Sequence, residues 1–254
     1  MMTSRCDLDY GTVENSFLLY KNVTRQYNDP KVLRTVRELI PDNALQESSL
    51  ESLLRWFKDF MKWMPNQPLC SICMGKNNNS EEKVFMKSTI QAGNSWKVRK
   101  VEVHTCSKCG HQEFYPRYND VLKIAETRTG RCGEWSILFG AVLSSISLQG
   151  RIAHDYLDHC WNEVNLDGRW IHVDSSLQYP DSFNHPYYYE RNWKKKYLYV
   201  LAFSTDTVED VTRSYTELWN DVLDRRTQLQ KNQKTVLSIP DLKIFYSGIT
   251  PACG

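Results

Sequence analysis

The hydrophobic and polar positions in the first quarter of the chain predict two helices. Residues 31–40 follow Asp29-Pro30, a typical helix start, and Pro41 stops them. Their apolar residues fall on one helical face, at Val32, Leu33, Val36, Leu39 and Ile40. Residues 46–64 repeat this spacing over a longer stretch, with an apolar stripe of Leu50, Leu53, Leu54, Phe57 and Met61. Residues 1–28 are mixed and weakly periodic, so they predict no definite element.

A third helix is predicted directly after a cysteine that two glycines flank. From Trp135 the apolar residues continue at helical spacing, at Leu138, Phe139, Val142, Leu143 and Ile146. Gly130 and Gly133 free the backbone around Cys132, which therefore lies at or just before the first helical turn. The unpaired N–H groups and partial positive charge of a helix N-terminus stabilise a thiolate over a thiol. Most cysteines are structural, but this position makes Cys132 a candidate nucleophile.

The strand-like runs that follow predict a β-hairpin. Residues 159–166 and 169–174 flank Asp167-Gly168, a strong two-residue turn signal. If the loop is symmetric about these two residues, Leu166 faces Arg169 across the hairpin. A one-residue bulge would turn the later side chains to the opposite face, so any site built on this hairpin depends on its register.

In that register a histidine and an aspartate become neighbours. His159 and Asp174 share one face of the hairpin and lie diagonally across from each other. Because an imidazole oriented by a carboxylate activates a thiol, Cys132, His159 and Asp174 are a candidate catalytic triad. His172 is a competing histidine on the second strand, but the register pairs it with Glu163, further from the end that carries Asp174.

Two C-x-x-C pairs precede the candidate nucleophile: Cys70 with Cys73, and Cys106 with Cys109. Such pairs are a usual way to bring four thiolates around tetrahedral zinc in a closed, structural site. The interval between the pairs exceeds the common zinc-ribbon spacing, which predicts an inserted hairpin or loop with a polar, flexible tip at residues 76–82. Two disulfides or a redox C-x-x-C are the alternatives, and His104 and His111 are possible substitute ligands.

The remainder of the chain predicts further strands and one helix. Strands are expected at residues 98–104, 197–204 and 239–246, and a polar helix at residues 212–230. Since helices precede and follow a cluster of strands, the order of elements argues for an α+β fold rather than for alternating βαβ units.

Composition narrows the functional classes. The 254 residues can bury one substantial core, or one core with a small appended domain. Lysine and arginine total 32 against 30 for aspartate and glutamate, so charge gives no argument for nucleic-acid binding. Lys194-Lys195-Lys196 is interpreted as a solvated face. No apolar stretch has the length of a membrane span or the pattern of a signal peptide, which favours a soluble protein of the cytoplasm or also the nucleus.

These segments together resemble the transglutaminase-like core of the cytosolic peptide:N-glycanases. The resemblance lies in Arg131-Cys132-Gly133-Glu134-Trp135, in residues 155–163 (DYLDHCWNE) and in Trp170-Ile171-His172-Val173-Asp174. Residues 192–203 and 210–215 also look like that family, and so do the two C-x-x-C pairs upstream of the nucleophile.

The family resemblance implies an activity and a role for each site residue. The implied reaction hydrolyses the amide bond between asparagine and the first N-acetylglucosamine of N-glycans on misfolded glycoproteins, within endoplasmic-reticulum-associated degradation. Cys132 is the implied nucleophile, His159 the acid and base, and Asp174 its orienting carboxylate. Trp193 matches a position that contacts the sugar. Leu177 departs from the family's usual glutamate, and loss of such a polar anchor costs about 1–3 kcal/mol.

The resemblance also implies a domain organisation, a cofactor and a partner. We expect an N-terminal helical segment at residues 1–45 and a transglutaminase-like, papain-like core at 46–254. A zinc-knuckle insertion at about 66–118 interrupts that core and holds one structural zinc ion on the four cysteines. The N-terminal region is the implied docking site for a ubiquitin-like proteasome shuttle protein.

Two other functions remain open from the residues alone. A transglutaminase or thiol protease uses the same order of cysteine, histidine and aspartate, and would form isopeptide bonds or cleave peptides. A zinc-stabilised adaptor would keep the fold for binding without catalysis. The intact triad disfavours that alternative, whereas Leu177, in place of the glutamate usual in the family that the chain resembles, favours it.

Overall fold

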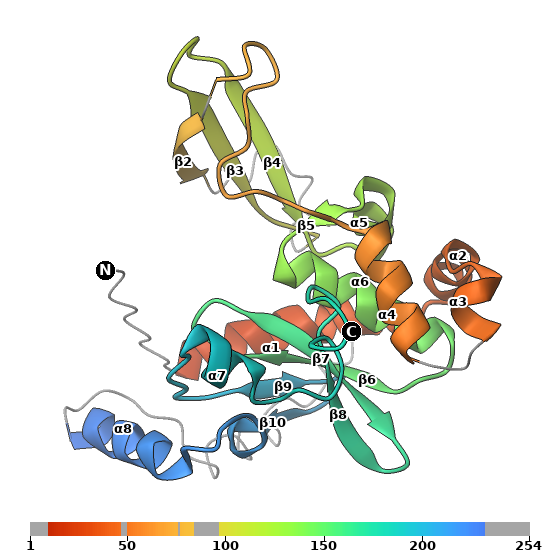
Figure 1. Ribbon diagram of the computed structural model, residues 1–254, viewed down its shortest axis with the longest axis vertical. Helices are drawn as coiled ribbons and strands as arrows, with labels where there is room; N and C mark the ends of the chain where they lie inside the picture. The colour runs from red at the N-terminus through yellow and green to blue at the C-terminus, as the bar shows by residue number, and fades with distance from the viewer. Residues whose placement is uncertain (1–9, 47–49, 76, 84–96, 232–254) are drawn as a thin grey trace, which may run out of the picture.

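The computed structural model is an α+β fold in which helices pack against a five-stranded antiparallel sheet (Figure 1). The structure describes residues 10–46, 50–75, 77–83 and 97–231. The strand predicted at 239–246 lies outside these ranges. None of the described helices combines the length and the apolar character that crossing a membrane requires.

The described residues form helices and three sheets. The helices are α1 (Tyr10–Arg25), α2 (Pro30–Leu39), α3 (Asp42–Gln46), α4 (Leu50–Phe60), α5 (Val121–Thr127), α6 (Cys132–Ser145), α7 (Tyr188–Trp193) and α8 (Trp219–Lys231), with 3-10 turns η1 (Gln26–Asn28) and η3 (Thr212–Tyr215). The large sheet has the order β10 (Val208–Asp210), β9 (Leu201–Phe203), β6 (Gly150–His154), β7 (Cys160–Leu166), β8 (Arg169–Val173). A three-stranded sheet joins β2 (Asn77–Lys83), β3 (Val98–Cys106) and β4 (Gln112–Tyr118), and β1 (Lys62–Trp63) pairs with β5 (Thr129–Gly130).

The N-terminal helices agree only in part with the sequence pattern. The helix predicted at 31–40 is confirmed as α2, whose start is capped by Asp29 through a 2.8 Å hydrogen bond from the backbone N–H of Lys31. The long helix predicted at 46–64 is shorter: α4 begins at Leu50, and the chain leaves it after Phe60 to form β1. The sequence pattern does not predict helix α1, because its apolar residues are mixed with polar ones and recur only weakly at helical spacing.

Both faces of the five-stranded sheet are buried. Alternate residues of its strands point into two separate clusters: Ile152 and Cys160 into the main core, and Ala153 and Trp161 into a smaller aromatic core. The main core also contains buried residues of α1, α2, α4 and α6. The division proposed at residue 45 stays a prediction, but the described N-terminal helices share this core with the rest of the protein.

Helix α6 occupies the centre of the molecule. The pattern predicts one buried face, whereas every residue from Glu134 to Leu143 is buried. The reason is that α6 packs against β6 and β7 on one side and against α2 and α5 on the other, as Figure 1 shows. The sheet and its covering helices therefore fix the start of α6, and Cys132 with it.

The hairpin of β7 and β8 has the predicted register. Leu166 pairs with Arg169 and Glu163 pairs with His172, with no bulge between them. Asp167 and Gly168 both take positive φ, at 52° and 79°, which is the backbone that a two-residue turn of this type requires.

The sheet of β2, β3 and β4 stands apart from the five-stranded sheet (Figure 1). The polar segment predicted as a flexible tip is instead part of β2, which pairs along β3 from Asn77 to Lys83. The prediction failed because ladder hydrogen bonds impose a strand on a polar sequence that has little strand propensity of its own. Towards the C-terminus, β9 covers only part of the strand predicted at 197–204, and α8 begins at Trp219 rather than at residue 212.

Gly140 gives a test of the packing around α6. A Cβ at this position would lie 2.6 Å from the hydroxyl of Tyr27, a buried group that donates a 2.8 Å hydrogen bond to the carbonyl of Ile137. We expect Gly140→Ala to lower the free energy of unfolding by about 1–3 kcal/mol, measured by urea denaturation. The matched control is Gly133→Ala, whose Cβ would meet no atom within 4 Å. We expect that change to stabilise the helix, and a wild-type unfolding midpoint for Gly140→Ala would contradict this packing.

Candidate active site and cysteine cluster

Cys132 is the first residue of α6, and its neighbour Arg131 is the N-cap. Arg131 has an extended backbone (φ −108°, ψ −168°), so the chain turns into the helix immediately before the thiol. The sulfur lies 3.7 Å from the backbone carbonyl oxygen of Asp158, in the turn that leads into β7. This turn also carries His159, which brings the thiol and the imidazole to one place.

His159 and Asp174 form a buried contact. Nε2 of His159 lies 2.7 Å from Oδ2 of Asp174, and the two residues are 5% and 1% exposed. His159 directly precedes β7 and Asp174 directly follows β8, so the hairpin register determines this contact. Because Nε2 faces the carboxylate, Nδ1 is the nitrogen left to face Cys132.

Asp174 accepts three more hydrogen bonds. The hydroxyl of Tyr189 donates to Oδ2 at 2.8 Å. The backbone N–H and the hydroxyl of Ser176 donate to Oδ1 at 2.9 and 2.7 Å. These bonds fix the carboxylate and replace the water that a buried charge loses. Neither residue was singled out from the sequence. Ser176 had a signal, since a serine two residues after an aspartate is typical of a local side-chain turn, but Tyr189 comes from a distant helix.

The charges of the triad favour an ion pair. Burial alone would lower the pKa of His159, but the Asp174 carboxylate and the Cys132 sulfur raise it to about 10. A hydrogen bond from Cys160 and the positive charge of His159 together outweigh burial and hold the pKa of Cys132 well below its ordinary value. Burial would raise the pKa of Asp174, but the His159 charge holds it below its usual range. At neutral pH the site is therefore a thiolate, an imidazolium and a carboxylate.

His172 does not face the thiol. Its Nε2 lies 2.7 Å from the hydroxyl of Tyr189, and its Nδ1 accepts a 3.3 Å hydrogen bond from the backbone N–H of His185. Burial lowers the pKa of His172 to about 4, so it is neutral at neutral pH. The competing histidine of the sequence thus supports Tyr189, which in turn bonds Asp174.

An acidic turn holds the backbone of His159. One carboxylate oxygen of Asp155 accepts the backbone N–H groups of Leu157 (2.9 Å), Asp158 (3.1 Å) and His159 (2.9 Å). Its other oxygen pairs with Nζ of Lys195 at 2.8 Å. The interpretation of the lysine run as a solvated face is therefore wrong for Lys195, which is largely buried and also pairs with Asp158.

Cys160 is a site residue that the sequence pattern did not reveal. It follows His159, and its thiol interacts with the sulfur of Cys132 and lies 3.5 Å from the hydroxyl of Ser136 on α6. A hydrogen bond to the Cys132 sulfur raises the pKa of Cys160 well above its ordinary value, so Cys160 stays a protonated donor. Strand alternation turns its side chain towards α6, but only the packing of sheet on helix brings it to Cys132.

Trp193 lies at the rim of the site. It is the last residue of α7, is 42% exposed, and its indole lies 5.0 Å from the imidazole of His159 between ring centroids. Leu177 packs against the smaller aromatic core instead of offering a polar group. The structure thus places Trp193 beside the imidazole and Leu177 in an apolar environment.

The four cysteines of the C-x-x-C pairs converge on one point. Their sulfur atoms, from Cys70, Cys73, Cys106 and Cys109, all lie within 4.8 Å of one another, and this group can hold a metal ion. Two of the sulfur pairs are separated by 3.6 and 3.5 Å, close to the edge of about 3.8 Å in a tetrahedron with 2.3 Å metal–sulfur bonds. A Cβ on Gly75 would lie 3.2 Å from two of the sulfur atoms, so a glycine leaves room for the cluster there.

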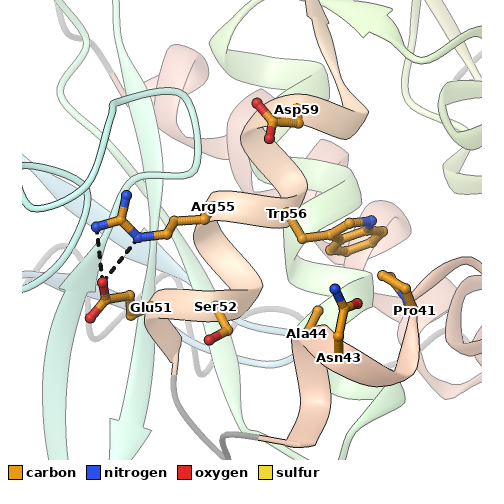
Figure 2. Close-up of a pocket in the computed structure, with 8 residues that line it drawn as sticks. All are labelled: Pro41, Asn43, Ala44, Glu51, Ser52, Arg55, Trp56 and Asp59. Carbon is orange, nitrogen blue, oxygen red and sulfur yellow. Dashed lines mark hydrogen bonds and ion pairs between the residues drawn. The ribbon is translucent and has the colours of Figure 1, made fainter.

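A surface hollow between α3 and α4 is separate from this site. Its volume is about 560 Å³, and its lining contains none of the triad residues. Figure 2 shows Trp56 pointing towards Pro41 and Asn43, whereas Arg55 points away and pairs with Glu51 at 2.9 Å. No cysteine or histidine lines this hollow, so it is not part of the candidate active site.

The chain resembles known proteins over most of its length. The family described as transglutaminase-like superfamily matches residues 87–175, which include Cys132, His159 and Asp174. A peptide-N(4)-(N-acetyl-beta-glucosaminyl)asparagine amidase of Saccharomyces cerevisiae is 39% identical over 203 residues, covering 78% of this chain and 53% of that protein. Over most of its length the chain is thus similar to peptide:N-glycanases, and it contains a transglutaminase-like region.

The chain covers only part of the length of the proteins that it resembles. The peptide:N-glycanase of Arabidopsis thaliana is 33% identical over 242 residues, which is 86% of this chain but 32% of the plant protein. The chain therefore spans about a third to a half of these relatives. A solved Rad4-Rad23 complex bound to a 6-4 photoproduct aligns with 92% of the chain and 56% of that protein chain, at 13% identity and a TM-score of 0.49, too remote to support a conclusion.

The ion pair of Cys132 and His159 predicts how Cys132 reacts with iodoacetamide. Because the pKa of Cys132 is lowered and that of His159 is raised to about 10, the thiolate persists well below the range of an ordinary cysteine. We expect the alkylation rate of Cys132, followed by mass spectrometry, to stay nearly constant from mildly acidic to mildly alkaline pH. Asp174→Asn removes the charge that raises the pKa of His159, so we expect at least about a tenfold loss of rate at neutral pH.

An ordinary thiol would behave differently. Its alkylation rate rises about tenfold for each pH unit until its pKa of about 8.5 is passed. That profile for wild-type Cys132 would contradict the ion pair.

Proposed function

We propose that this chain hydrolyses the amide bond that links an asparagine side chain to the first N-acetylglucosamine of an N-glycan. The observation that carries the proposal is the buried contact of His159 with Asp174, 2.7 Å long, beside a cysteine at a helix start. The curated relatives named for this reaction support the choice of substrate over a peptide or an isopeptide bond.

The first step is acyl transfer to the enzyme. The Cys132 thiolate attacks the carbonyl carbon of the asparagine side chain, and its electron pair forms the C–S bond while the carbonyl π pair moves to oxygen. As the tetrahedral intermediate collapses, the C–N bond breaks and the imidazolium of His159 donates its proton to the departing nitrogen. The products are a thioester on Cys132 and a free glycosylamine.

The second step returns the enzyme to its starting state. A water molecule loses a proton to the now neutral His159 and attacks the thioester carbon, which releases the Cys132 thiolate and an aspartate on the protein substrate. Throughout, Asp174 holds the imidazole with Nδ1 towards the sulfur and stabilises its charged form. Tyr189 and Ser176 keep that carboxylate in place.

The start of α6 supplies a donor for the developing oxyanion. As the first residue of the helix, Cys132 has a backbone N–H without an intrahelical acceptor. A backbone N–H next to the nucleophile suits the oxygen of a tetrahedral intermediate, and the helix dipole adds to its effect.

Trp193 supports a sugar at the rim of the site. An indole that is partly exposed and lies against the imidazole of His159 gives the apolar C–H face of a pyranose a surface to stack on. Leu177 provides no hydrogen bond to a sugar hydroxyl, so we propose that this chain binds its glycan more weakly than relatives that carry a glutamate there.

We further propose that the four cysteines hold one structural zinc ion. Four thiolates in tetrahedral proximity form a closed site without a position for water, and zinc is the usual occupant of such a site. The bound ion would hold the loops around Cys70 and Cys106 together and would take no part in the reaction. The knuckle region at about 66–118 would then be a zinc-stabilised insertion in the core.

The family resemblance also suggests the cellular substrates and a partner of this chain. Substrates would be misfolded glycoproteins met in the cytoplasm or nucleus, and a ubiquitin-like proteasome shuttle protein would dock at the N-terminal helices.

Incubation with a denatured N-glycoprotein tests the reaction. We expect the wild type to release the whole glycan and leave aspartate at the former glycosylation site, whereas Cys132→Ala releases none because it lacks the nucleophile. Mass spectrometry of the substrate peptide reads both changes. If the folded, metal-loaded wild type leaves the glycan in place, the activity is contradicted, and peptide cleavage or amine incorporation in the same sample would identify a protease or a transglutaminase.

Metal content tests the cysteine cluster. We expect the purified protein to contain zinc in a one-to-one ratio and Cys70→Ser to lose it, with a lower thermal unfolding temperature, because three thiolates bind less tightly than four. Cys132→Ser is the control, since it removes a thiol outside the cluster and should retain the metal. Folded wild-type protein without stoichiometric metal, whose unfolding temperature a chelator leaves unchanged, would contradict the site.

A further inference from the structure

Four charged side chains that the reaction does not use form a closed cluster behind Cys132. Glu102 comes from β3, Arg117 from β4, and Arg131 and Glu134 from the start of α6. The side chains of Glu102 and Glu134 are 3% and 5% exposed, and those of Arg117 and Arg131 are 10% and 19% exposed. We call these four residues the charge ring.

Every member of the charge ring contacts two others. Arg117 binds Glu134 through two hydrogen bonds, Nε to Oε1 at 2.7 Å and Nη2 to Oε2 at 2.6 Å, and reaches Glu102 through Nη1 at 2.8 Å. Arg131 binds Glu102 through Nη1 at 2.8 Å and Nη2 at 2.7 Å. The ring closes where the backbone N–H of Arg131 donates to Oε2 of Glu134 at 3.0 Å. Two of these arginine–carboxylate contacts are bidentate, the strongest and most directional kind.

The two positive and two negative charges balance inside the protein. Burial would lower the pKa of Arg117, but its bonds to Glu134 and Glu102 keep it charged. Hydrogen bonds from Arg117 and Arg131 likewise outweigh burial and lower the pKa of Glu102. Removal of one member would leave a buried charge without its partner. The ring therefore has one stable arrangement and holds its backbone elements at fixed distances.

The residue that precedes Cys132 is the point where these constraints meet. The backbone N–H of Arg131 donates to Glu134 in the first turn of α6, and its guanidinium donates to Glu102 on β3 of the three-stranded sheet. Gly130 makes room for this arrangement, because a Cβ there would lie 2.3 Å from the Cβ of Glu134. A shift of Arg131 would move the Cys132 backbone through a single peptide link.

We propose that Glu102, Arg117, Arg131 and Glu134 are positioning residues that aim the Cys132 sulfur at His159 by fixing the start of α6 to the β2–β3–β4 sheet. This assignment rests on the proposed thiol mechanism but not on the identity of the substrate. The sheet that carries Cys106 at the end of β3 is thereby part of the active-site scaffold, since Glu102 lies on the same strand.

Alkylation of Cys132 by iodoacetamide tests this role without a glycan. Glu102→Gln keeps the shape of the side chain and removes the charge that two arginines share. Arg117→Lys keeps a charge but cannot form the bidentate pair with Glu134. The matched control is Asp210→Asn, which breaks a different, largely buried ion pair, that of Asp210 with Arg226 at 2.9 Å. Circular dichroism and metal content identify the variants that fold. If Glu102→Gln does not fold, the alkylation rate of Arg117→Lys provides the test.

In the folded ring variants we expect the alkylation rate of Cys132 at neutral pH to fall at least about tenfold, and its pH profile to move towards that of an ordinary thiol. Where glycan release is measurable, kcat should fall by about a hundredfold with KM little changed, because a misplaced sulfur binds substrate but reacts poorly. The Asp210→Asn control should retain the wild-type alkylation rate and profile.

Folded ring variants with the wild-type alkylation rate and pH profile would overturn the proposal, and so would an equal loss in the Asp210→Asn control. Failure of the proposed function has a different signature. In that case wild-type Cys132 would react as a low-pKa thiol and lose this reactivity in the ring variants, yet no glycan would be released from any protein.

Discussion

The contact between His159 and Asp174 is the interaction on which the site depends. Both groups are buried, so each would be costly to ionise without the other, and together they keep an imidazolium next to Cys132. Removal of one partner from such a buried pair typically costs about 3–5 kcal/mol. Tyr189 and Ser176 complete the hydrogen bonds of the carboxylate, which is why it stays charged in a place that water does not reach.

The rest of the fold supplies the positions that this contact needs. A two-residue turn at Asp167-Gly168 sets the register of β7 and β8, and that register alone brings the two ends of the hairpin together. The five-stranded sheet, buried on both faces, keeps the hairpin rigid against α6. The thiol of Cys132 comes from a separate element, the start of α6, a helix that is buried almost all round. The charge ring binds the first turn of this helix.

Local patterns predicted the parts of the structure that local physics determines. The turn residues and strand alternation were sufficient to pair Glu163 with His172, and the glycines around Cys132 marked a helix start. Side chains brought in from distant segments were not predictable. The bond from Tyr189, the thiol of Cys160 and the salt bridges from Glu102 depend on tertiary packing, which leaves no spacing signal in one sequence. The polar strand β2 is not predictable for the same reason, since its partner strand determines its conformation.

Cys132 is a thiolate at neutral pH because His159 is protonated beside it. The ultraviolet absorbance of a thiolate, measured as the difference between the wild type and Cys132→Ala across a pH titration, tests this claim most directly. We predict that the difference is already complete at neutral pH and declines only under acidic conditions. A difference that develops only near the pKa of about 8.5 of an ordinary cysteine would contradict the account.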